Sequence, residues 1–401
     1  MLSIEEALET VADNVSPLET ESVRLQHAHG RFLAEDVEGR VELPPFDGSA
    51  MDGYAIRSAD APGPLNIIGE SAAGFPYNGP ALSARTAVTI STGGVIPEGA
   101  DAVVPVEDTT VDGDRVWVPN VVERDAHIRP AGSDIELGEP LLLAGARIGP
   151  AQIGAAAAGG LRELPCRRLP RVAVLTTGTE LRPIGEPLGP GQIYDSNGPM
   201  LDAALRTAGG IVELIGAAAD TPDAHREAFE RALQHDVVIS SGGVSVGEHD
   251  LVRDIGRELG VRELFWRVAL RPGKPISFGM RDRTLVFGLP GNPVSTLVCF
   301  ELFVRPALLS MQGAPEFRPA FGAGVLGSSV RRNPQRDDLI RVQVAWTSLK
   351  AGRRGSPVLL PLVGQQSHQI AITARAEGLA RIPAGTGELA AGTEVSYLPL
   401  Q

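Results

Sequence analysis

The spacing of apolar residues changes along the chain, and each pattern predicts a different kind of element. Near the N-terminus, Ser3-Ile-Glu-Glu6 has the spacing of a capping box, and the apolar residues that follow recur at helical period. A second helix is predicted near 29–36. A third is predicted over 148–158, with Pro150 in its first turn and Gly159-Gly160 just past its end.

Between 44 and 139 the pattern is that of short strands. Runs such as Ala87-Val-Thr-Ile90 and Arg115-Val-Trp-Val118 alternate with turns rich in Gly, Pro and Asp. We therefore predict a mostly β domain over 44–139. It would be inserted into an N-terminal helical and linker domain made of 1–43 and 140–169.

Between 170 and 313 near-continuous apolar runs alternate with helical stretches. The runs that predict strands are 172–175, 211–215, 237–239 and 285–287, and the helices are predicted over 199–207, 222–233, 250–259 and 293–309. Apolar strands separated by helices indicate an α/β domain whose doubly wound, mostly parallel sheet is covered on both faces. Over 314–401 the alternating pattern returns, as in Leu339-Ile-Arg-Val-Gln-Val-Ala345, and predicts a C-terminal β-barrel or sandwich. The expected fold class is multidomain α/β.

Composition narrows the classes of function. The chain has 401 residues and a net charge of -13, which argues against nucleic-acid binding because that needs a basic surface. Its two cysteines cannot form a disulfide framework and fit a reducing compartment, so we expect a cytoplasmic protein. The acidic N-terminus lacks the pattern of a signal peptide, and no apolar run approaches the roughly 18 residues of a membrane span.

Three loops of small residues follow three of the predicted strands: Thr176-Thr-Gly-Thr-Glu180, Ser240-Ser-Gly-Gly-Val-Ser-Val-Gly-Glu-His-Asp250 and Leu289-Pro-Gly-Asn-Pro-Val-Ser295. Ligands of such sheets bind beyond the carboxyl ends of the strands, where exposed backbone N–H groups form anion-binding nests. Asn292 as N-cap and Pro293 at the first helical position would add a helix N-terminus. Arg271-Pro-Gly-Lys274 would add two cations. The loops together predict a pocket for an anionic ligand.

Each of these stretches has a simpler interpretation when it is taken alone. A glycine loop after a strand can be a connector, and Asp250 can be the first acid of the helix that it opens. Arg271-Pro-Gly-Lys274 can be a solvated turn. The shared pocket is the preferred hypothesis because three loops would converge on one edge of one sheet.

The motifs, taken as a set, resemble a known family. They are Pro44-Pro-Phe-Asp-Gly-Ser-Ala-Met-Asp-Gly-Tyr-Ala55, Thr177-Gly-Thr-Glu-Leu181, Ile193-Tyr-Asp-Ser-Asn197, the stretch from Asp236 to Asp250, Arg271-Pro-Gly-Lys-Pro275 and Gly288-Leu-Pro-Gly-Asn-Pro293. The set resembles the molybdopterin molybdenumtransferase family, MoeA, which is related to the C-terminal part of gephyrin. The resemblance covers essentially the whole chain.

The resemblance implies a fold, an assembly and a reaction. It implies that 170–313 is a molybdopterin-binding domain and that the chain forms an elongated homodimer. The active site would lie between this domain and the inserted β domain of the other subunit. The reaction would insert molybdenum from molybdate into adenylylated molybdopterin and release AMP with the help of Mg²⁺ or another divalent cation. An adenylyltransferase and apo-molybdoenzymes would be protein partners.

The resemblance also assigns roles to residues. The metal ligands would be Glu180, Asp220 and Asp250. The other catalytic residues would be Asp52 from the inserted domain of the second subunit, and Arg267, Arg271 and Lys274, which would hold molybdate and phosphate. The cofactor would be bound by Thr92, Thr177, Gly178, Ser241, Gly242, Gly243, Ser245, Gly247, Pro290, Gly291, Asn292 and Pro293. Asp134 would lie near the same cleft, or would be a solvated loop charge.

Two other classes of function stay open. One is a binding protein that keeps the molybdopterin pocket as a non-catalytic scaffold. The other is a nucleotide enzyme of the molybdopterin adenylyltransferase type, which the central α/β domain alone would also match.

The chain departs from the family pattern at two positions. Relatives often carry Lys where this chain has Arg267 and Arg271, and Arg keeps the charge in a different, planar geometry.

Overall fold

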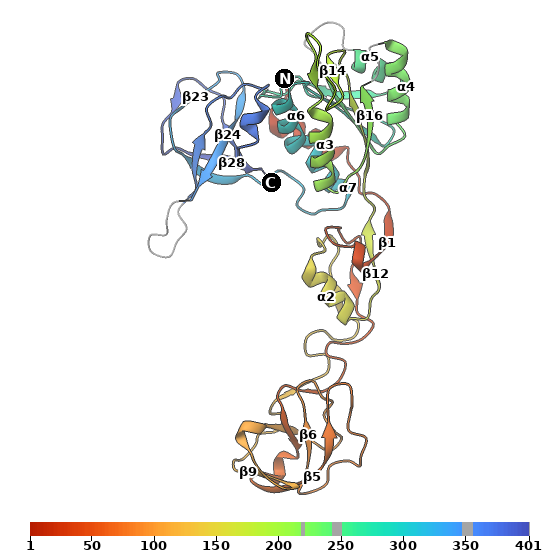
Figure 1. Cartoon of the computed structure of the whole chain (residues 1–401), viewed down its shortest axis with the longest axis vertical. Coiled ribbons are helices and arrows are strands. Elements are labelled where there is room, and N and C mark those ends of the chain that lie inside the picture. Colours follow the sequence, from red (N-terminus) through yellow and green to blue (C-terminus); the bar gives the residue numbers. More distant parts are fainter. Residues whose placement is uncertain (218–220, 243–250, 347–355, 401) are drawn as a thin grey trace. The chain divides into compact units, whose positions relative to one another are not determined.

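The computed structural model describes residues 1–217, 221–242, 251–346 and 356–400. The chain divides into two compact units (Figure 1). The first contains Met1–Glu21, Gly30–Phe32 and Arg167–Gln401, and the second contains Ser22–His29 and Leu33–Cys166. Paired strands β1 (Thr20–Arg24) and β12 (Glu163–Arg167) carry the chain from one unit to the other and back.

A six-stranded sheet in the order β16-β13-β17-β21-β20-β18 forms the centre of the first unit. The first four strands run parallel, β20 runs antiparallel to them, and β18, which pairs antiparallel with β20, again runs in their direction. Their bounds are β13 (Arg171–Thr176), β16 (Ile211–Ala217), β17 (Val237–Ser241), β18 (Arg262–Trp266), β20 (Ser277–Arg281) and β21 (Thr284–Leu289). The parallel strands contain the four apolar runs identified above, so the mostly parallel sheet is confirmed.

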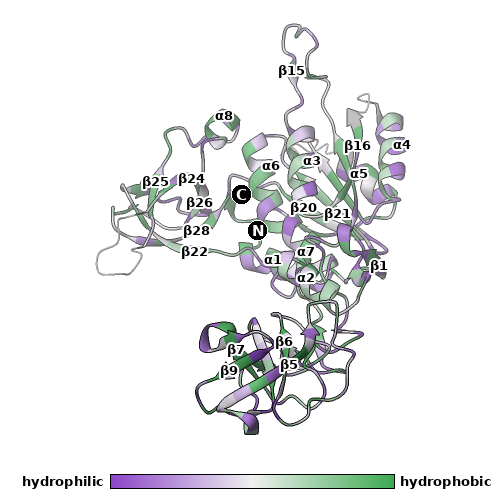
Figure 2. Cartoon of the chain, turned by 60° about the horizontal axis from the view of Figure 1, so that its bottom comes forward, coloured by the Kyte–Doolittle hydropathy of each residue, from purple (hydrophilic) through white to green (hydrophobic). Residues whose placement is uncertain are grey.

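Successive residues of the parallel strands pack on opposite faces of the sheet. On one face, Val172 and Val174 of β13 pack with helices α1, α3, α6 and α7, whereas on the other face Ala173 and Leu175 pack with α4 and α5 (Figure 1). The helix bounds are α1 (Ile4–Asp13), α3 (Asn197–Thr207), α4 (Pro222–Ala232), α5 (Leu251–Glu258), α6 (Pro293–Cys299) and α7 (Arg305–Met311). The sheet is therefore covered on both faces, and the surface helix α4 carries hydrophilic residues (Figure 2).

The chain winds outward in two directions from β13. It first adds β16 on one side and then crosses over to add β17 and β21 on the other. The direction of winding thus switches between β13 and β17, and the carboxyl ends at a switch point are where ligands bind in open α/β sheets.

The helix predicted over 293–309 is a continuous helical run over Pro293–Met311, made of α6, the π-helical segment η4 (Phe300–Val304) and α7. Among the described residues, this run alone has the length and hydropathy of a membrane span. It is 72% buried within the protein, where Phe300, Phe303 and Leu308 belong to the main core.

The C-terminal strands form a closed barrel. Five strands join in the order β24-β25-β22-β28-β26, and β26 pairs back with β24. Their bounds are β22 (Gly322–Leu326), β24 (Asp337–Ala345), β25 (Val358–Pro361), β26 (Gly378–Ile382) and β28 (Glu394–Pro399). The short strand β19 (Leu270–Arg271) comes from the α/β region and pairs with β24, so Arg271 lies beside Asp338. The remaining elements here are β23 (Val330–Arg331), β27 (Glu388–Leu389) and α8 (Ile370–Thr373).

The second unit contains a six-stranded sheet in the order β7-β4-β6-β5-β9-β8. Its strands are β4 (Gly53–Ile56), β5 (Gly63–Ser71), β6 (Thr86–Ile90), β7 (Ala102–Pro105), β8 (Thr110–Asp112) and β9 (Arg115–Val118), and its core includes Ile56, Leu65 and Val116. Smaller elements are the 3-10 turns η1 (Leu25–His27), η2 (Ser58–Asp60) and η3 (Val106–Asp108), the strand pairs β2 (Val37–Glu38) with β11 (Pro140–Leu142) and β3 (Gly48–Ser49) with β10 (Ile128–Arg129), and α2 (Pro150–Ala158).

Two of the helices predicted outside the α/β region are confirmed and one is wrong. In α1, the Ser3 hydroxyl accepts from the Glu6 N–H at 3.1 Å and the Glu6 carboxylate accepts from the Ser3 N–H at 2.7 Å, as the capping box requires. No helix spans 29–36. There Leu33 pairs with Cys166 and donates its N–H to the Ala146 carbonyl at 3.0 Å, so long-range contacts hold this stretch extended.

Candidate functional site

Three loops meet at the carboxyl ends of β13, β17 and β21. The strands are in register there, with Thr176 beside Ser241 and Ser241 beside Leu289. Just beyond, the Thr177 N–H donates to the Ser241 carbonyl at 3.3 Å, and the Gly242 N–H donates to the Leu289 carbonyl at 3.3 Å. The structure therefore brings the first residues of the three loops together at one edge of the sheet.

Gly242 lies at the centre of this meeting point. Its φ of 93° is in the left-handed region, and a Cβ atom there would lie 2.6 Å from the Thr177 carbonyl oxygen. Gly291 comes close from the other side, because a Cβ built on it would lie 3.5 Å from the Gly242 Cα. The backbones of the three loops thus pack at a separation that a side chain at 242 would disturb.

Asn197, at the start of α3, ties the loops to one another. Its Nδ2 donates to the Ser241 hydroxyl at 2.9 Å and to the Gly291 carbonyl at 2.7 Å. The Asp195 carboxylate accepts from the N–H groups of Asn197 and Gly198 and fixes the start of the helix. Asn197 was not among the predicted site residues, although Ile193-Tyr-Asp-Ser-Asn197 is one of the motifs identified in the sequence.

The acidic residues predicted to hold a metal are only partly described. Glu180 is exposed, in the loop between β13 and β14 (Leu181–Arg182), which pairs with β15 (Ile193–Tyr194). Asp220 and Asp250, and the loop residues Gly243, Ser245 and Gly247, lie outside the described residues. Within the described residues, no group of three His, Cys, Asp or Glu side chains could hold a metal ion.

A pocket of about 360 Å³ lies beside the loop after β21. It is lined by the turn that carries Arg271 and Lys274, by the start of α6, and by two segments of the C-terminal barrel region. The lining residues are Arg271, Pro272, Gly273, Lys274, Pro275, Pro290, Asn292, Ser295, Arg336, Gln365, Gln366 and Ser367. Four predicted site residues therefore line one pocket: Arg271, Lys274, Pro290 and Asn292. Gly291 and Pro293 are their neighbours in the chain.

The pocket is cationic. Arg271 forms an ion pair with Asp338, which is only 1% exposed, and one oxygen of that carboxylate has no hydrogen-bond partner. Burial raises the pKa of Asp338, and the neighbouring Arg271 only partly offsets this. Lys274 and Arg336 form no ion pair with any described residue. Lys274 is also one of only two lysines among the 36 basic residues of the chain, which sets it apart already in the sequence.

The barrel side of the pocket was not predicted. Arg336, Gln365, Gln366 and Ser367 follow the α/β domain by 20 residues or more in the sequence. The pairing of β19 with β24 places the segment that begins with Arg336 next to the Arg271 turn. The Ser367 carbonyl also accepts from the Val294 N–H at 3.1 Å, which fixes the second segment to the start of α6.

Arg267 does not line this pocket, although it was predicted to act with Arg271 and Lys274. Its guanidinium carbon lies 3.6 Å from the centre of the Trp266 ring, so the two stack. Its φ is 75°, and its buried Nε has no hydrogen-bond partner among the described residues.

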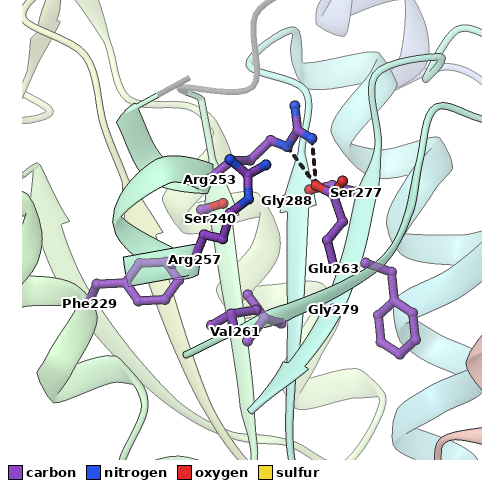
Figure 3. Close-up of a pocket in the computed structure, with 12 residues that line it drawn as sticks. Phe229, Ser240, Arg253, Arg257, Val261, Glu263, Ser277, Gly279 and Gly288 are labelled. Atoms are coloured by element: carbon purple, nitrogen blue, oxygen red, sulfur yellow. Dashed lines mark hydrogen bonds and ion pairs between the residues drawn. The ribbon is translucent and has the colours of Figure 1, made fainter. Parts of the chain in front are cut away.

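A smaller pocket lies under α5, on the other face of the sheet (Figure 3). Ser240, Gly288 and Ser277 lie side by side across three strands at its floor. Arg253 crosses its rim and donates two hydrogen bonds, at 2.8 and 2.6 Å, to Glu263. Its volume of about 40 Å³ has room for on the order of two water molecules, and is too small for a nucleotide or a pterin.

In the second unit, Asp52 and Thr92 lie together. The Thr92 N–H donates to Asp52 Oδ1 at 2.6 Å, and the hydrogen bonds from the backbone and side chain of Thr92 lower the pKa of the Asp52 carboxyl. Asp52 is exposed, so the structure presents an ionised carboxylate at the surface of this unit. Asp134 is exposed as well, in the turn after β10, where its N–H donates to the Leu43 carbonyl at 2.9 Å.

Comparison with known proteins covers nearly the whole chain. Three family models match: the MoeA N-terminal region (domain I and II) over residues 2–160, a probable molybdopterin binding domain over 173–310, and the MoeA C-terminal region (domain IV) over 323–400. Molybdopterin molybdenumtransferase 2 of Mycobacterium tuberculosis is 38% identical, with both chains covered in full. Molybdopterin molybdenumtransferase of Haemophilus influenzae is 38% identical over 80% of this chain and 81% of its own.

The fold agrees with these matches. The crystal structure of the molybdopterin biosynthesis MoeA protein from Pyrococcus horikosii superimposes with a TM-score of 0.84 at 32% sequence identity. The superposition covers 100% of this chain and 99% of that one.

Proposed function

Because the chain belongs to the MoeA family, we propose that it is a molybdopterin molybdenumtransferase. It takes molybdate and adenylylated molybdopterin, transfers molybdenum to the molybdopterin and releases AMP. This activity agrees with the names of relatives that match the chain over its full length.

The cationic pocket at the Arg271–Lys274 turn is the observation that carries the proposal. Molybdate is a small dianion, and it needs cations and N–H donors in a partly desolvated site. Among the described residues, Lys274 and Arg336 form no ion pair, and Arg336 acts on Asp338 only at longer range, so an anion in the pocket would be a counter-charge for both. The Ser295 hydroxyl adds a small polar group at the start of α6.

The adjacent strand ends fit the phosphate and pterin side of the substrate. Pro290 and Asn292 belong both to the loop after β21 and to the pocket lining, so the two regions are continuous. The close backbone packing around Gly242 leaves peptide groups rather than side chains at this edge, which suits recognition of a phosphate. The two substrates would then meet at the loop from Leu289 to Pro293.

Release of AMP breaks a phosphoanhydride bond as an oxygen of water bonds to one phosphorus, and it leaves a new negative charge on the departing phosphate oxygen. Cations fixed beside that oxygen stabilise the charge as it develops. Lys274 and Arg271 both line the pocket and supply such cations. Their role in the step is therefore to hold both anions and to neutralise the leaving group.

A magnesium ion is part of the proposal. Mg²⁺ binds through one or two carboxylates together with substrate phosphate, and the exposed Glu180 beside the strand ends is a donor of this kind. Asp220 and Asp250 would complete the set. The bound ion would neutralise phosphate charge.

The assembly and location are proposed as well. In the proposed homodimer, the exposed and ionised Asp52 of the inserted β domain acts in the site of the other subunit, next to Thr92. A cytoplasmic location agrees with Cys166 and Cys299, which are both buried and are not joined by a disulfide. The adenylyltransferase that makes the substrate and the apo-molybdoenzymes that receive the product are the proposed partners.

The test is to incubate the purified chain with adenylylated molybdopterin and molybdate, and to follow AMP release and reconstitution of an apo-molybdoenzyme. Both should depend on molybdate and on a divalent cation. Tight molybdopterin binding without AMP release would favour a scaffold. Activity on ATP and molybdopterin that ignores molybdate would favour an adenylyltransferase.

A further inference from the structure

Arg341, on β24 of the barrel, is an arginine that the structure buries almost completely. It is 1% exposed and is the largest of the fully buried side chains among the described residues. None of the described carboxylates forms an ion pair with it. Burial lowers the pKa of its guanidinium, yet arginine remains charged at neutral pH. A buried charge of this kind needs a structural or functional reason, because removing it from water is costly.

The five N–H groups of the guanidinium are all used on the segment from Gly364 to Thr373, four of them on its loop and one on Thr373 of α8. Nε donates to Gln365 Oε1 at 3.2 Å. Nη1 donates to the Gln369 carbonyl at 3.1 Å and to the Thr373 hydroxyl at 3.0 Å. Nη2 donates to the carbonyls of Gly364 at 2.9 Å and Gln366 at 3.2 Å. Since this accounts for every donor of the side chain, Arg341 sets the path of the loop from Gly364 to Gln369.

The direction of those carbonyls decides where the N–H groups of the loop point. In a planar trans peptide, the C=O and the N–H point to opposite sides. The carbonyls of Gly364 and Gln366 face Arg341, so the N–H groups of Gln365 and Ser367 face away from it. In the described part of the chain, neither N–H donates to a protein acceptor.

The same loop lines the cationic pocket. Gln365, Gln366 and Ser367 are part of its wall, whereas Arg341 is not. Two N–H donors without a described acceptor therefore belong to the barrel wall of a pocket that Lys274 also lines, and a buried positive charge lies behind that wall. Backbone N–H groups that a turn holds toward a concave surface can bind anions, and here the N–H of Gln366, between the two, donates to Gln369 Oε1 instead.

We propose that Arg341 is a positioning residue for the oxyanion substrate. It turns two peptide groups of the 364–367 loop so that the N–H groups of Gln365 and Ser367 are presented to molybdate. Its own charge lies behind the loop. The inference rests on the proposed function, because it takes molybdate to be the occupant of the pocket.

The first test is calorimetric titration of the full chain with molybdate. The wild-type chain should bind, and Arg341→Gln and Arg341→Lys should both lower the affinity at least about tenfold, which corresponds to about 1.4 kcal/mol. The lysine variant is the discriminating one. It keeps the positive charge but cannot reproduce a five-donor planar fork.

Arg332→Lys is the matched control. Arg332 lies in the same barrel region and donates from Nε to the Pro383 carbonyl at 3.1 Å and from Nη2 to the Ala384 carbonyl, away from the pocket lining. It should bind molybdate like the wild-type chain. Wild-type affinity in Arg341→Lys would overturn the positioning role, and equal losses in both lysine variants would reduce it to a general effect on the barrel.

A second measurement needs no variant, in case Arg341 is required for folding. The amide NMR signals of Gln365 and Ser367 in the wild-type chain should shift as molybdate saturates the pocket, and their hydrogen exchange should slow. Unmoved amides at saturation would overturn the inference alone. Failure of the wild-type chain to bind molybdate at all would overturn the proposed function, and this inference with it.

Discussion

The Arg271 guanidinium forms an ion pair with the buried carboxylate of Asp338, across the parallel pairing of β19 with β24. Asp338 is 1% exposed, whereas the Arg271 side chain is half exposed and lines the cationic pocket. The same guanidinium is thus available to an internal anion and to an incoming one. We therefore expect an oxyanion that enters the pocket to compete with Asp338 for Arg271.

This competition predicts that Asp338→Asn strengthens molybdate binding by about threefold or more, because Arg271 is then free to pair with the oxyanion. Calorimetry measures the effect. Asp337→Asn is the control, because Asp337 bonds Arg381 at 2.7 Å and does not line the pocket. Weaker binding in Asp338→Asn would show that the carboxylate holds Arg271 in place for the substrate.

Lys274 should not tolerate replacement by arginine. In a chain with 34 arginines and 2 lysines, position 274 carries the compact ammonium, between Arg271 and the start of α6. Lys274→Ala should raise the KM for molybdate at least about tenfold, equal to about 1.4 kcal/mol of lost binding, and Lys274→Arg should restore little of it. Arg318→Ala, an exposed cation far from this turn in sequence, should leave the KM unchanged. Full activity in Lys274→Arg would show that charge alone matters.

The proposed dimeric site is tested by mixing two inactive chains. Asp52→Ala and Glu180→Ala should each abolish AMP release, and hybrid dimers should regain one intact site. Random exchange between the subunits of a two-fold dimer should restore about a quarter of the wild-type activity. Mass spectrometry of the mixture verifies exchange. No recovery in a mixture that has exchanged would place both residues in one subunit's site.

Asp236 should make stability depend on acid pH. Burial opposes its ionisation, but two hydrogen bonds of 2.7 Å from Arg168 and one from the Arg171 N–H outweigh this and lower the pKa of the carboxyl. The stabilisation is therefore present above the unfolded pKa of about 3.9 and is lost as the pH falls through the lower folded pKa. Asp236→Asn should cost about 1 to 3 kcal/mol at neutral pH in urea unfolding.

The difference between Asp236→Asn and the wild-type chain should shrink as the pH falls through the lowered folded pKa of Asp236, because both chains then carry a neutral group at 236. Asp282→Asn is the control, since that carboxyl is 92% exposed and sits in a hairpin turn. A constant difference across the pH range would mean that the Arg168 pair contributes through packing and not through charge.

Gly242→Ala should damage the meeting point of the three loops. The residue would have to adopt a φ of 93° with its Cβ against the Thr177 carbonyl, so the strain of about 1 to 2 kcal/mol adds to a steric clash. Gly260→Ala is the matched control, because Gly260 has a φ of 88° and open space around it. Urea unfolding and molybdopterin binding should both weaken more in Gly242→Ala. Equal losses in Gly242→Ala and Gly260→Ala would mean that backbone strain alone, and not the clash with Thr177, explains the effect.

Much of the fold follows from the sequence because apolar periodicity reports which face of an element is buried. The runs around Val172, Val237 and Leu285 became the buried parallel strands, and the small residues after them mark their carboxyl ends. Since parallel strands share one direction, residues far apart in the chain, such as Thr177 and Gly291, had to approach the same edge. This part of the candidate site was therefore predictable.

The tertiary structure alone decided what covers each face. The alternation around Arg341 predicts an outward polar side chain, yet the segment from Gly364 to Thr373 covers it and makes it a buried donor of five hydrogen bonds. Likewise, Arg267 and Lys274 look equivalent in the sequence. In the structure, however, Arg267 stacks on Trp266, whereas Lys274 lines the pocket. The periodicity of apolar residues predicts to which side of its own strand or helix a side chain points. The burial and the partners of that side chain depend on segments from elsewhere in the chain.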